Sequence, residues 1–305
     1  MEQLTFQEFV TELADYVKQR LEEESNPPEV KIQEVPKPGN QIQTALTIVE
    51  PGSHMSRLFY LDDMYPSYTA GMPLDSIKEN LFAYIRKEGT TVPFDGLDMQ
   101  WEKVKDKVVM RLINLERNSL YVAGRVYRPL EGTSLGLIYD IDVGCTREGS
   151  ARLCVTEKVR QLLGVSEEEL CAAAYANTQR IAPASIRPIT DVMEELMPGE
   201  DPSEVREPQL FVVTNKEKIN GAVAVLYPEM EEKIRQIVGG EFYLIPSSVH
   251  EMLAIGRQYM EPEELKAMIR EVNVSSVEPG DILDDTPYCL TNGRLYPARV
   301  HVAVD

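Results

Sequence analysis

Strand-like and helix-like segments follow one another irregularly along this chain of 305 residues, and that order constrains the fold more than any single motif. A doubly wound parallel sheet needs a strict β-α-β succession, and none is visible, nor is an internal repeat of fixed period. Short turn formers separate several neighbouring strand-like stretches, which favours antiparallel pairing. The sequence therefore predicts an α+β fold with mixed helices and mainly antiparallel sheets.

Residues 1–95 predict an N-terminal β-β-β-α unit with a leading helix. Thr5 and Glu8 form a capping box, and apolar residues then recur at helical spacing until a Pro-Pro pair. A further helix is expected after Pro73. The strand-like stretches between the two helices lie at residues 29–35, 41–49 and 56–62.

The remaining chain predicts two further α+β segments, at residues 96–205 and 206–305. Ser166 and Glu169 form a second capping box, and the proline-rich stretch 197–208 is expected to be an exposed linker. Asn292-Gly293 predicts a type I′ hairpin turn. The apolar residues between 219 and 226 suit either a helix or a strand. Other strands are expected near 108–114, 134–142, 151–155, 209–214 and 242–245, with helices from Pro228 and Pro262.

Charge limits the classes of partner. Fifty acidic and 31 basic side chains give a formal charge of −19, which repels nucleic acids and anionic lipids. The segment 101–128 departs from this balance with a local charge of +4, so it could present a basic face to an acidic partner, or be a solvated face. No apolar run is long enough to span a membrane and no signal peptide is recognisable, so we expect a cytoplasmic protein.

The sequence contains the residue pattern of a hydrolase motif without the secondary structure that the motif requires. Gly132–Gly136 satisfies G-x-S-x-G, and Asp191 and His250 follow in the order of a catalytic triad. A nucleophile elbow needs a strand before the serine and a helix after it, whereas here a strand-like segment follows. We therefore expect a turn at Ser134 and no nucleophile.

His250-Glu251 begins a zinc-protease motif, but Ala254 replaces the second histidine. Ser248 is expected to cap a helical turn that Glu251 completes. The alternative is that Ser248 and His250 form an acid-base pair with a distant carboxylate.

Metal and cofactor sites are not expected. The four cysteines and three histidines lack ligand spacing, and no phosphate-binding or dinucleotide-binding glycine motif occurs. Asp140 and Asp142 share one face of a probable strand and could hold Mg²⁺, but no third ligand is identifiable, which favours a solvated strand face.

The preferred binding surface follows the strand near 108–114. Arginine and asparagine side chains cluster there, and such groups suit gripping a carboxylate, a phosphate or a peptide backbone. The alternative is a salt-bridged strand end. The predicted binding residues are Arg111, Asn114, Arg117 and Asn118.

Four phrases carry a resemblance to a known family: YLDDMYPSY (60–68), VVMRLINLERN (108–118), VTNKEKINGAVAVLYP (213–228) and YLIPSSVHEML (243–253). They resemble a bacterial domain-of-unknown-function family of gut anaerobes and their mobile elements, and the later segments distantly resemble YtpQ-type proteins. The resemblance implies an intracellular bacterial protein with an accessory role in mobile DNA, and it carries over no catalytic residues.

Two hypotheses of function follow. The first is a non-enzymatic cytoplasmic interaction or accessory protein that binds a protein or peptide partner through the 108–118 region and the N-terminal unit. The second is a hydrolase or transferase that uses Ser248 or His250 with a distant carboxylate. A deep pocket with convergent polar groups near His250 would favour the enzyme.

Overall fold

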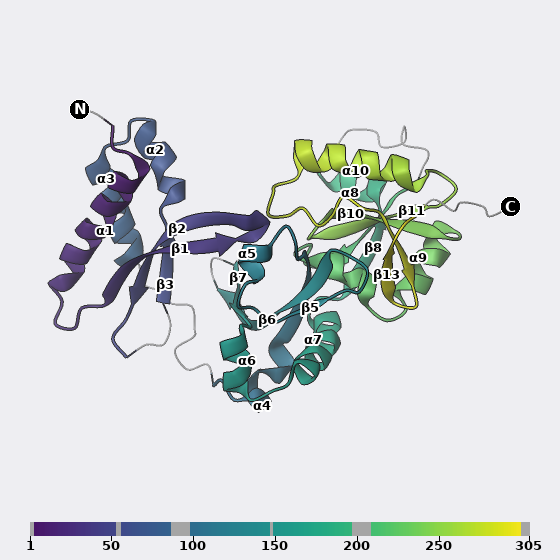
Figure 1. The fold of residues 1–305 in the computed structure, drawn as a ribbon, viewed down its shortest axis with the longest axis horizontal. Coiled ribbons are helices and arrows are strands. Elements are labelled where there is room, and N and C mark those ends of the chain that lie inside the picture. Colours follow the sequence, from purple (N-terminus) through teal and green to yellow (C-terminus); the bar gives the residue numbers. More distant parts are fainter. Residues whose placement is uncertain (1–2, 53–55, 87–97, 147–148, 197–208, 300–305) are drawn as a thin grey trace. The chain divides into compact units, whose positions relative to one another are not determined.

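The computed structural model describes residues 3–52, 56–86, 98–146, 149–196 and 209–299 (Figure 1). It comprises two compact units: unit 1 spans residues 1–37 and 41–97, and unit 2 spans residues 38–40 and 98–305. The predicted boundaries after residues 95 and 205, and the predicted linker at 197–208, lie outside the described residues. The described strands form three mainly antiparallel sheets beside helices, which confirms the α+β fold.

Unit 1 packs helices on one face of a three-stranded antiparallel sheet of order β1-β2-β3. The predicted capping box is present: the Thr5 hydroxyl accepts from the Glu8 N–H, and the Glu8 carboxylate accepts from the Thr5 N–H. The elements are α1 (Phe6–Glu22), β1 (Glu29–Lys37), β2 (Gln41–Val49), β3 (Ser56–Tyr60), α2 (Tyr65–Thr69) and α3 (Leu74–Arg86).

The core of unit 1 lies between this sheet and helices α1 and α3. Leu13 and Val17 on α1 are fully buried, and they pack with Leu46 and Ile48 of β2 and Leu81 of α3 in one apolar cluster. Burying such aliphatic side chains contributes roughly 1.5–3 kcal/mol each, so this cluster is the main source of the unit's stability.

Unit 2 begins with a four-stranded sheet built around the long strand β6. Strand β4 pairs with one edge of β6, while β5 and β7 pair with its other edge, all antiparallel. Helix α7 covers β4, and its capping box at Ser166 and Glu169 is formed as predicted. The elements are α4 (Trp101–Val104), β4 (Val108–Asn114), α5 (Ser119–Val122), β5 (Tyr127–Pro129), β6 (Leu135–Thr146), β7 (Gly149–Cys154), α6 (Glu157–Leu163) and α7 (Glu167–Ile181).

A six-stranded antiparallel sheet of order β13-β12-β10-β11-β9-β8 completes unit 2. Helix α10 packs on β10 through Tyr243 and Ile245, and α9 contacts β10 and β11 as well. The predicted hairpin turn at Asn292-Gly293 has positive φ at both residues, as a type I′ turn requires. The elements are β8 (Ala184–Pro188), α8 (Ile189–Leu196), β9 (Phe211–Asn215), η5 (Gly221–Leu226), α9 (Met230–Val238), β10 (Phe242–Ser248), β11 (Glu251–Gly256), α10 (Pro262–Ser276), β12 (Tyr288–Thr291) and β13 (Arg294–Pro297).

Two local expectations had different outcomes. Within the ambiguous stretch 219–226, residues Gly221–Leu226 form the 3-10 helix η5, and residues 219 and 220 belong to the loop before it. The helical turn predicted at Ser248–Glu251 is wrong: Val249 and His250 form the turn of a β-hairpin between β10 and β11, because the apolar strands on either side pair in register, with Ile245 opposite Leu253. None of the described helices has the length and apolar character needed to cross a membrane.

Candidate functional site

The pairing of β4 with β6 brings a cation and a carboxylate together inside unit 2. Arg111 lies opposite Ile138, so Asp140, two residues further along β6, is its diagonal neighbour on the same face. The Arg111 Nε donates to the Asp140 Oδ2 at 2.5 Å, and the two side chains are 17% and 4% exposed. Burial alone would lower the pKa of Arg111, but the adjacent carboxylate raises it above its usual value. The solvated strand face expected at Asp140 is wrong.

Arg125, which follows α5, is the second cation beside this carboxylate. Its Nη1 lies 3.6 Å from the Asp140 Oδ1, and its side chain is 15% exposed. Its guanidinium stacks on the Tyr121 ring, 4.0 Å from the ring centroid, and its Nε donates to the Tyr121 carbonyl at 3.1 Å. The Tyr121 hydroxyl in turn accepts from Arg111 Nη2 at 3.3 Å. These contacts fix both guanidinium groups in position.

Strand β7 adds a third arginine to the same place. Cys154 lies opposite Asp140 in the β6–β7 ladder and Arg152 lies opposite Asp142, so the four residues share one face. Asp140, Arg152 and Cys154 border a cavity of about 340 Å³, which we name the arginine pocket. The arginine pocket is lined by Arg111, Tyr121, Arg125, Asp140, Arg152, Cys154, Ile219 and Asn220.

The charge of the arginine pocket is unbalanced. Its lining holds three guanidinium groups and one carboxylate, a surplus of +2 in a chain of charge −19. Arg125 Nη1 and Arg152 Nε are buried and form no hydrogen bond with any residue in the described parts of the chain. Buried polar atoms are nearly always paired, so two such donors within this cluster raise the free energy of the folded state.

The far wall of the arginine pocket is the loop between β9 and η5. Asn215 shapes this loop, because its Nδ2 donates to the Ile219 carbonyl at 2.9 Å and its Oδ1 accepts from the Ile219 N–H at 3.3 Å. Asn220 has a positive φ of 52°. The next residue must be glycine, since a Cβ on Gly221 would lie 2.2 Å from the Thr214 hydroxyl oxygen. Local sequence thus sets where Ile219 and Asn220 lie.

The predicted catalytic candidates Ser248 and His250 support the backbone of this loop through hydrogen bonds. The His250 Nδ1 accepts from the Asn220 N–H at 3.1 Å, and its Nε2 lies 3.5 Å from the Asp281 carboxylate. The Ser248 hydroxyl accepts from the His250 backbone N–H at 3.1 Å. No hydrogen bond between the Ser248 hydroxyl and the His250 ring occurs among the described residues, and neither residue lines the arginine pocket.

Two of the predicted binding residues hold backbone turns. Asn114 Oδ1 accepts from the backbone N–H groups of Glu116 and Arg117, and Asn118 Nδ2 donates to the Asn114 carbonyl at 2.8 Å. Asn118 Oδ1 also accepts from the N–H of Gly39, a residue of the same unit. Both asparagines are buried. Their side-chain groups are therefore committed to structure, whereas Arg111 enters the arginine pocket.

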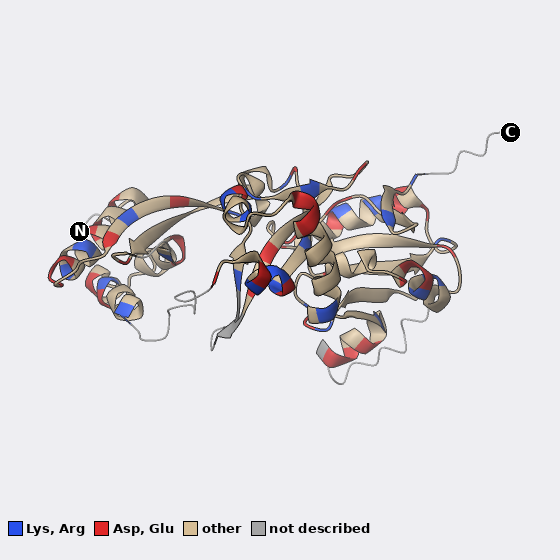
Figure 2. Cartoon of the chain, turned by 90° about the horizontal axis from the view of Figure 1, so that it is seen from below, with Lys and Arg blue, Asp and Glu red and all other residues tan. Residues whose placement is uncertain are grey.

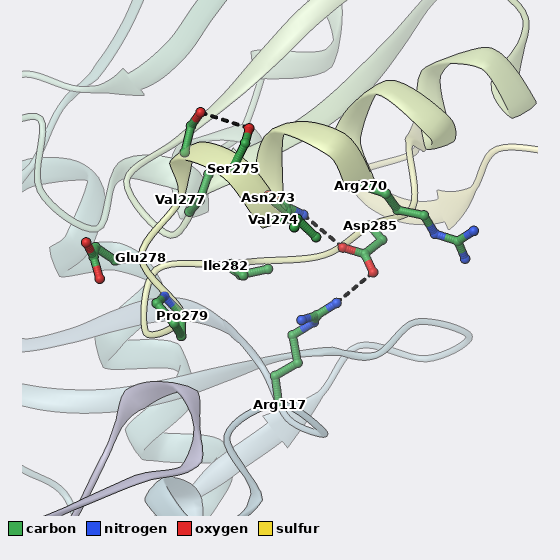
Figure 3. A pocket seen from close by; sticks show the side chains of 11 residues that line it. Arg117, Arg270, Asn273, Val274, Ser275, Val277, Glu278, Pro279, Ile282 and Asp285 are labelled. Carbon is green, nitrogen blue, oxygen red and sulfur yellow. Dashed lines mark hydrogen bonds and ion pairs between the residues drawn. The ribbon is translucent and has the colours of Figure 1, made fainter.

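Arg117, the fourth predicted binding residue, lies apart from the arginine pocket and borders a second cavity of about 680 Å³ (Figure 3). Its Nη2 donates to Asp285 Oδ2 at 2.6 Å, and Asp285 Oδ1 accepts from Asn273 at 2.8 Å. Arg117 and Arg270 are matched in this lining by Asp285 and Glu278. With its charges balanced, the second cavity gives a weaker reason to expect a charged ligand.

Ser134 is also engaged in structure. Its hydroxyl donates to the buried carboxylate of Asp284, which accepts from the Tyr288 hydroxyl at 2.5 Å and from the Asp285 N–H at 2.6 Å. Burial raises the pKa of Tyr288 well above its usual value. Strand β6 begins directly after Ser134. The turn-then-strand context expected there is confirmed.

The side chains that line the arginine pocket suit the binding of an anion. Guanidinium groups stay protonated at all physiological pH values, so they cannot act as acids or bases there. Burial raises the pKa of Cys154, which keeps its thiol in the neutral form. Within the described parts of the chain, no group of three or more His, Cys, Asp or Glu side chains is arranged to hold a metal ion.

The sequence contained some signals for this site. Arg111 and Arg125 lie in the basic segment 101–128, and Asp140 lies on an expected strand. Arg152 and Tyr121 were missed. Arg152 could have been found by pairing the expected strands at 134–142 and 151–155 as a hairpin, which places it beside the aspartates.

Comparison with models of known protein families shows which family this chain belongs to. The model of a family of unknown function, DUF5688, matches residues 6–291. The comparison with curated proteins gave no match, and the comparison with solved structures gave none. Because the matched region spans both units and nearly the whole chain, the protein belongs to the DUF5688 family of unknown function.

Proposed function

We propose that this protein is a non-enzymatic interaction protein whose unit 2 binds an anionic group of its partner in the arginine pocket. The observation that carries the proposal is the convergence of Arg111, Arg125 and Arg152 on one cavity with Asp140 as the single carboxylate of its lining. Guanidinium groups form paired, charge-assisted hydrogen bonds with carboxylates and phosphates. An anion that entered would balance the surplus charge.

The charges of the rest of the chain support a selective role. Figure 2 shows Lys and Arg interspersed with Asp and Glu on the helices of both units. A chain of charge −19 repels polyanions at long range, so an anionic group gains attraction only where cations are concentrated. This favours one anionic group on a protein or peptide partner over a nucleic acid. A cytoplasmic accessory role, including one in bacterial mobile DNA, fits the same proposal.

The test is anion-dependent stabilisation at constant ionic strength. A ligand that binds only the folded state raises the unfolding midpoint in proportion to RT ln(1 + [L]/Kd). We expect phosphate and sulfate to raise the melting temperature of the wild type above that in chloride, and Arg152→Gln to remove the difference. Arg128→Gln is the matched control, because Arg128 lies on β5 of the same sheet and contacts Cys171 outside the arginine pocket.

Equal melting temperatures in phosphate, sulfate and chloride, together with no heat of binding in calorimetry, would refute the proposed function. Retention of the anion effect in Arg152→Gln, or its loss in Arg128→Gln as well, would show a general salt effect instead of a site. Arg125→Gln provides a second variant of the arginine pocket if Arg152→Gln fails to fold.

A further inference from the structure

We infer that the anionic group recognised by the arginine pocket is the dianion of a phosphate monoester. This inference rests on the proposed function and names its ligand class. The lining charge of +2 matches two negative charges, whereas a carboxylate or a sulfate monoester carries one. A phosphate monoester loses its second proton near pH 6, so it is mostly a dianion at neutral pH and presents three acceptor oxygens.

The geometry of the donors favours a group with several oxygens. Arg111 and Arg152 come from β4 and β7, which flank β6 on its two edges, and Arg125 comes from the residue stretch after α5, so the donors are distributed over three segments of the lining. A planar carboxylate pairs well with one guanidinium fork at a time, while a tetrahedral phosphate directs oxygens toward several donors. The Arg111 and Arg125 groups are already held by Tyr121 and Asp140. Little ordering is therefore needed on binding.

The size of the cavity implies more than a bare ion. Its volume of about 340 Å³ falls near the lower end of small-ligand pockets, which are roughly 300–1,000 Å³. Its wall includes the Ile219 side chain, which is half exposed at the surface, and the Tyr121 ring. Apolar side chains beside the guanidinium groups suit a phosphate ester, in which the phosphate is joined to an organic group.

The groups that face this site predict how binding depends on pH. Guanidinium groups in general keep their charge at physiological pH, and burial raises the pKa of Cys154 above its usual value. The other ionisable neighbours are Asp140 and Tyr121 in the lining, Asp142 one step along the same strand face, and His250 behind Asn220. A ligand that does not itself titrate is needed to separate their effect from that of the phosphate.

Methyl phosphate and methyl sulfate provide that comparison, because they have nearly the same shape but differ by one charge at pH 7.5. Calorimetry with the full-length protein should show methyl phosphate binding at least about tenfold more tightly, since a second charge strengthens every charge-assisted hydrogen bond. Lowering the pH to 5.0 should weaken methyl phosphate about tenfold, because the dianion is then the minor form. Methyl sulfate should change little.

Two variants test whether the preference for methyl phosphate over methyl sulfate arises in the arginine pocket. Arg152→Gln should remove most of the preference for methyl phosphate, while Arg128→Gln should keep it. Equal affinities for the two esters at pH 7.5, or a fall with pH that methyl sulfate shares, would overturn the dianion inference while leaving an anion site in place. Absence of binding by both esters would refute the proposed function itself, so the two failures are distinguishable.

Two sources could supply the same ester, and a further pair of ligands separates them. Glycerol 3-phosphate stands for a phosphorylated small molecule, and a tripeptide with a central phosphoserine stands for a modified protein partner. Tighter binding of the tripeptide would assign the site to a phosphorylated protein segment, and tighter binding of glycerol 3-phosphate would assign it to a small phosphorylated molecule. Weaker binding of both than of methyl sulfate would contradict the inference.

Discussion

Removing the single carboxylate of the arginine pocket should destabilise unit 2 strongly. In Asp140→Asn the Arg111 guanidinium keeps its burial but loses a charged partner at 2.5 Å, and Arg125 loses one at 3.6 Å. Breaking a buried pair by removing one member costs about 3–5 kcal/mol, because the remaining charge stays out of water. Arg111 and Arg125 retain some exposure, so we expect the lower end, about 3 kcal/mol.

The fluorescence of Trp101 can measure the unfolding of unit 2 specifically. It is the only tryptophan in the sequence and lies on α4 in unit 2, so its fluorescence during urea unfolding reports that unit. Glu195→Gln is the control, because Glu195 pairs with Arg187 and Lys218 at the surface. Exposed ion pairs contribute little, so its unfolding midpoint should barely move.

The same variant tests the arginine pocket through its ligand. With the carboxylate gone the lining charge becomes +3, so phosphate should raise the unfolding midpoint of Asp140→Asn more than that of the wild type. A free energy of unfolding within about 1 kcal/mol of the wild type would show that the ion cluster is effectively solvated. A smaller phosphate effect in the variant would show that Asp140 helps to hold the ligand and does not compete with it.

Three further predictions concern single sites. Gly221→Ala should destabilise unit 2 by roughly 3 kcal/mol in urea unfolding, because the added Cβ would lie 2.6 Å from the Asn215 backbone nitrogen. Burial raises the pKa of Cys154, so a mass-spectrometric assay should find it alkylated by iodoacetamide at pH 8 more slowly in the folded than in the urea-unfolded protein. Arg117→Glu, at a 39% exposed side chain, should remain folded by circular dichroism, whereas Arg111→Glu should not.

Short-range signals in the sequence predicted the elements well. The capping boxes at Thr5 and Ser166 are decided within four residues, and the hairpin turn at Asn292-Gly293 needs only two residues that tolerate positive φ. Such features depend on local sterics and hydrogen bonds, which a sequence displays directly. For the same reason strand β4 begins and ends where the apolar run 108–114 predicts.

The errors occur where distant residues decide the local structure. Ser248–Glu251 carries the spacing of a helix cap, yet the pairing of β10 with β11 makes a hairpin turn there. Residues 219–226 fit two periodicities, and the close approach of Gly221 to β9 accompanies a 3-10 helix instead. Neither the strand partner nor the close approach can be read from the segment itself.

In the arginine pocket, too, some features follow from local sequence and others depend on distant residues. Arg111, Arg125 and the excess of positive charge around them were visible in the segment 101–128. That these cations turn inward toward Asp140, and that Arg152 joins them, depends on the register of β4, β6 and β7. Sequence reasoning identified Arg111 by its chemistry and placed it with Arg117, but the two arginines border different cavities.

Stability alone does not account for the arginine pocket. A buried ion pair is no more stabilising than apolar packing of equal volume, and buried guanidinium nitrogens without a hydrogen bond add a cost. Two further carboxylates in the lining would balance the charge, and acidic residues are plentiful in this chain, yet the lining has Cys154 and Ile219 beside the arginines. An anion entering from solvent meets cations that are already desolvated and held in place, so the unbalanced charge that destabilises the empty fold is the same charge that strengthens binding.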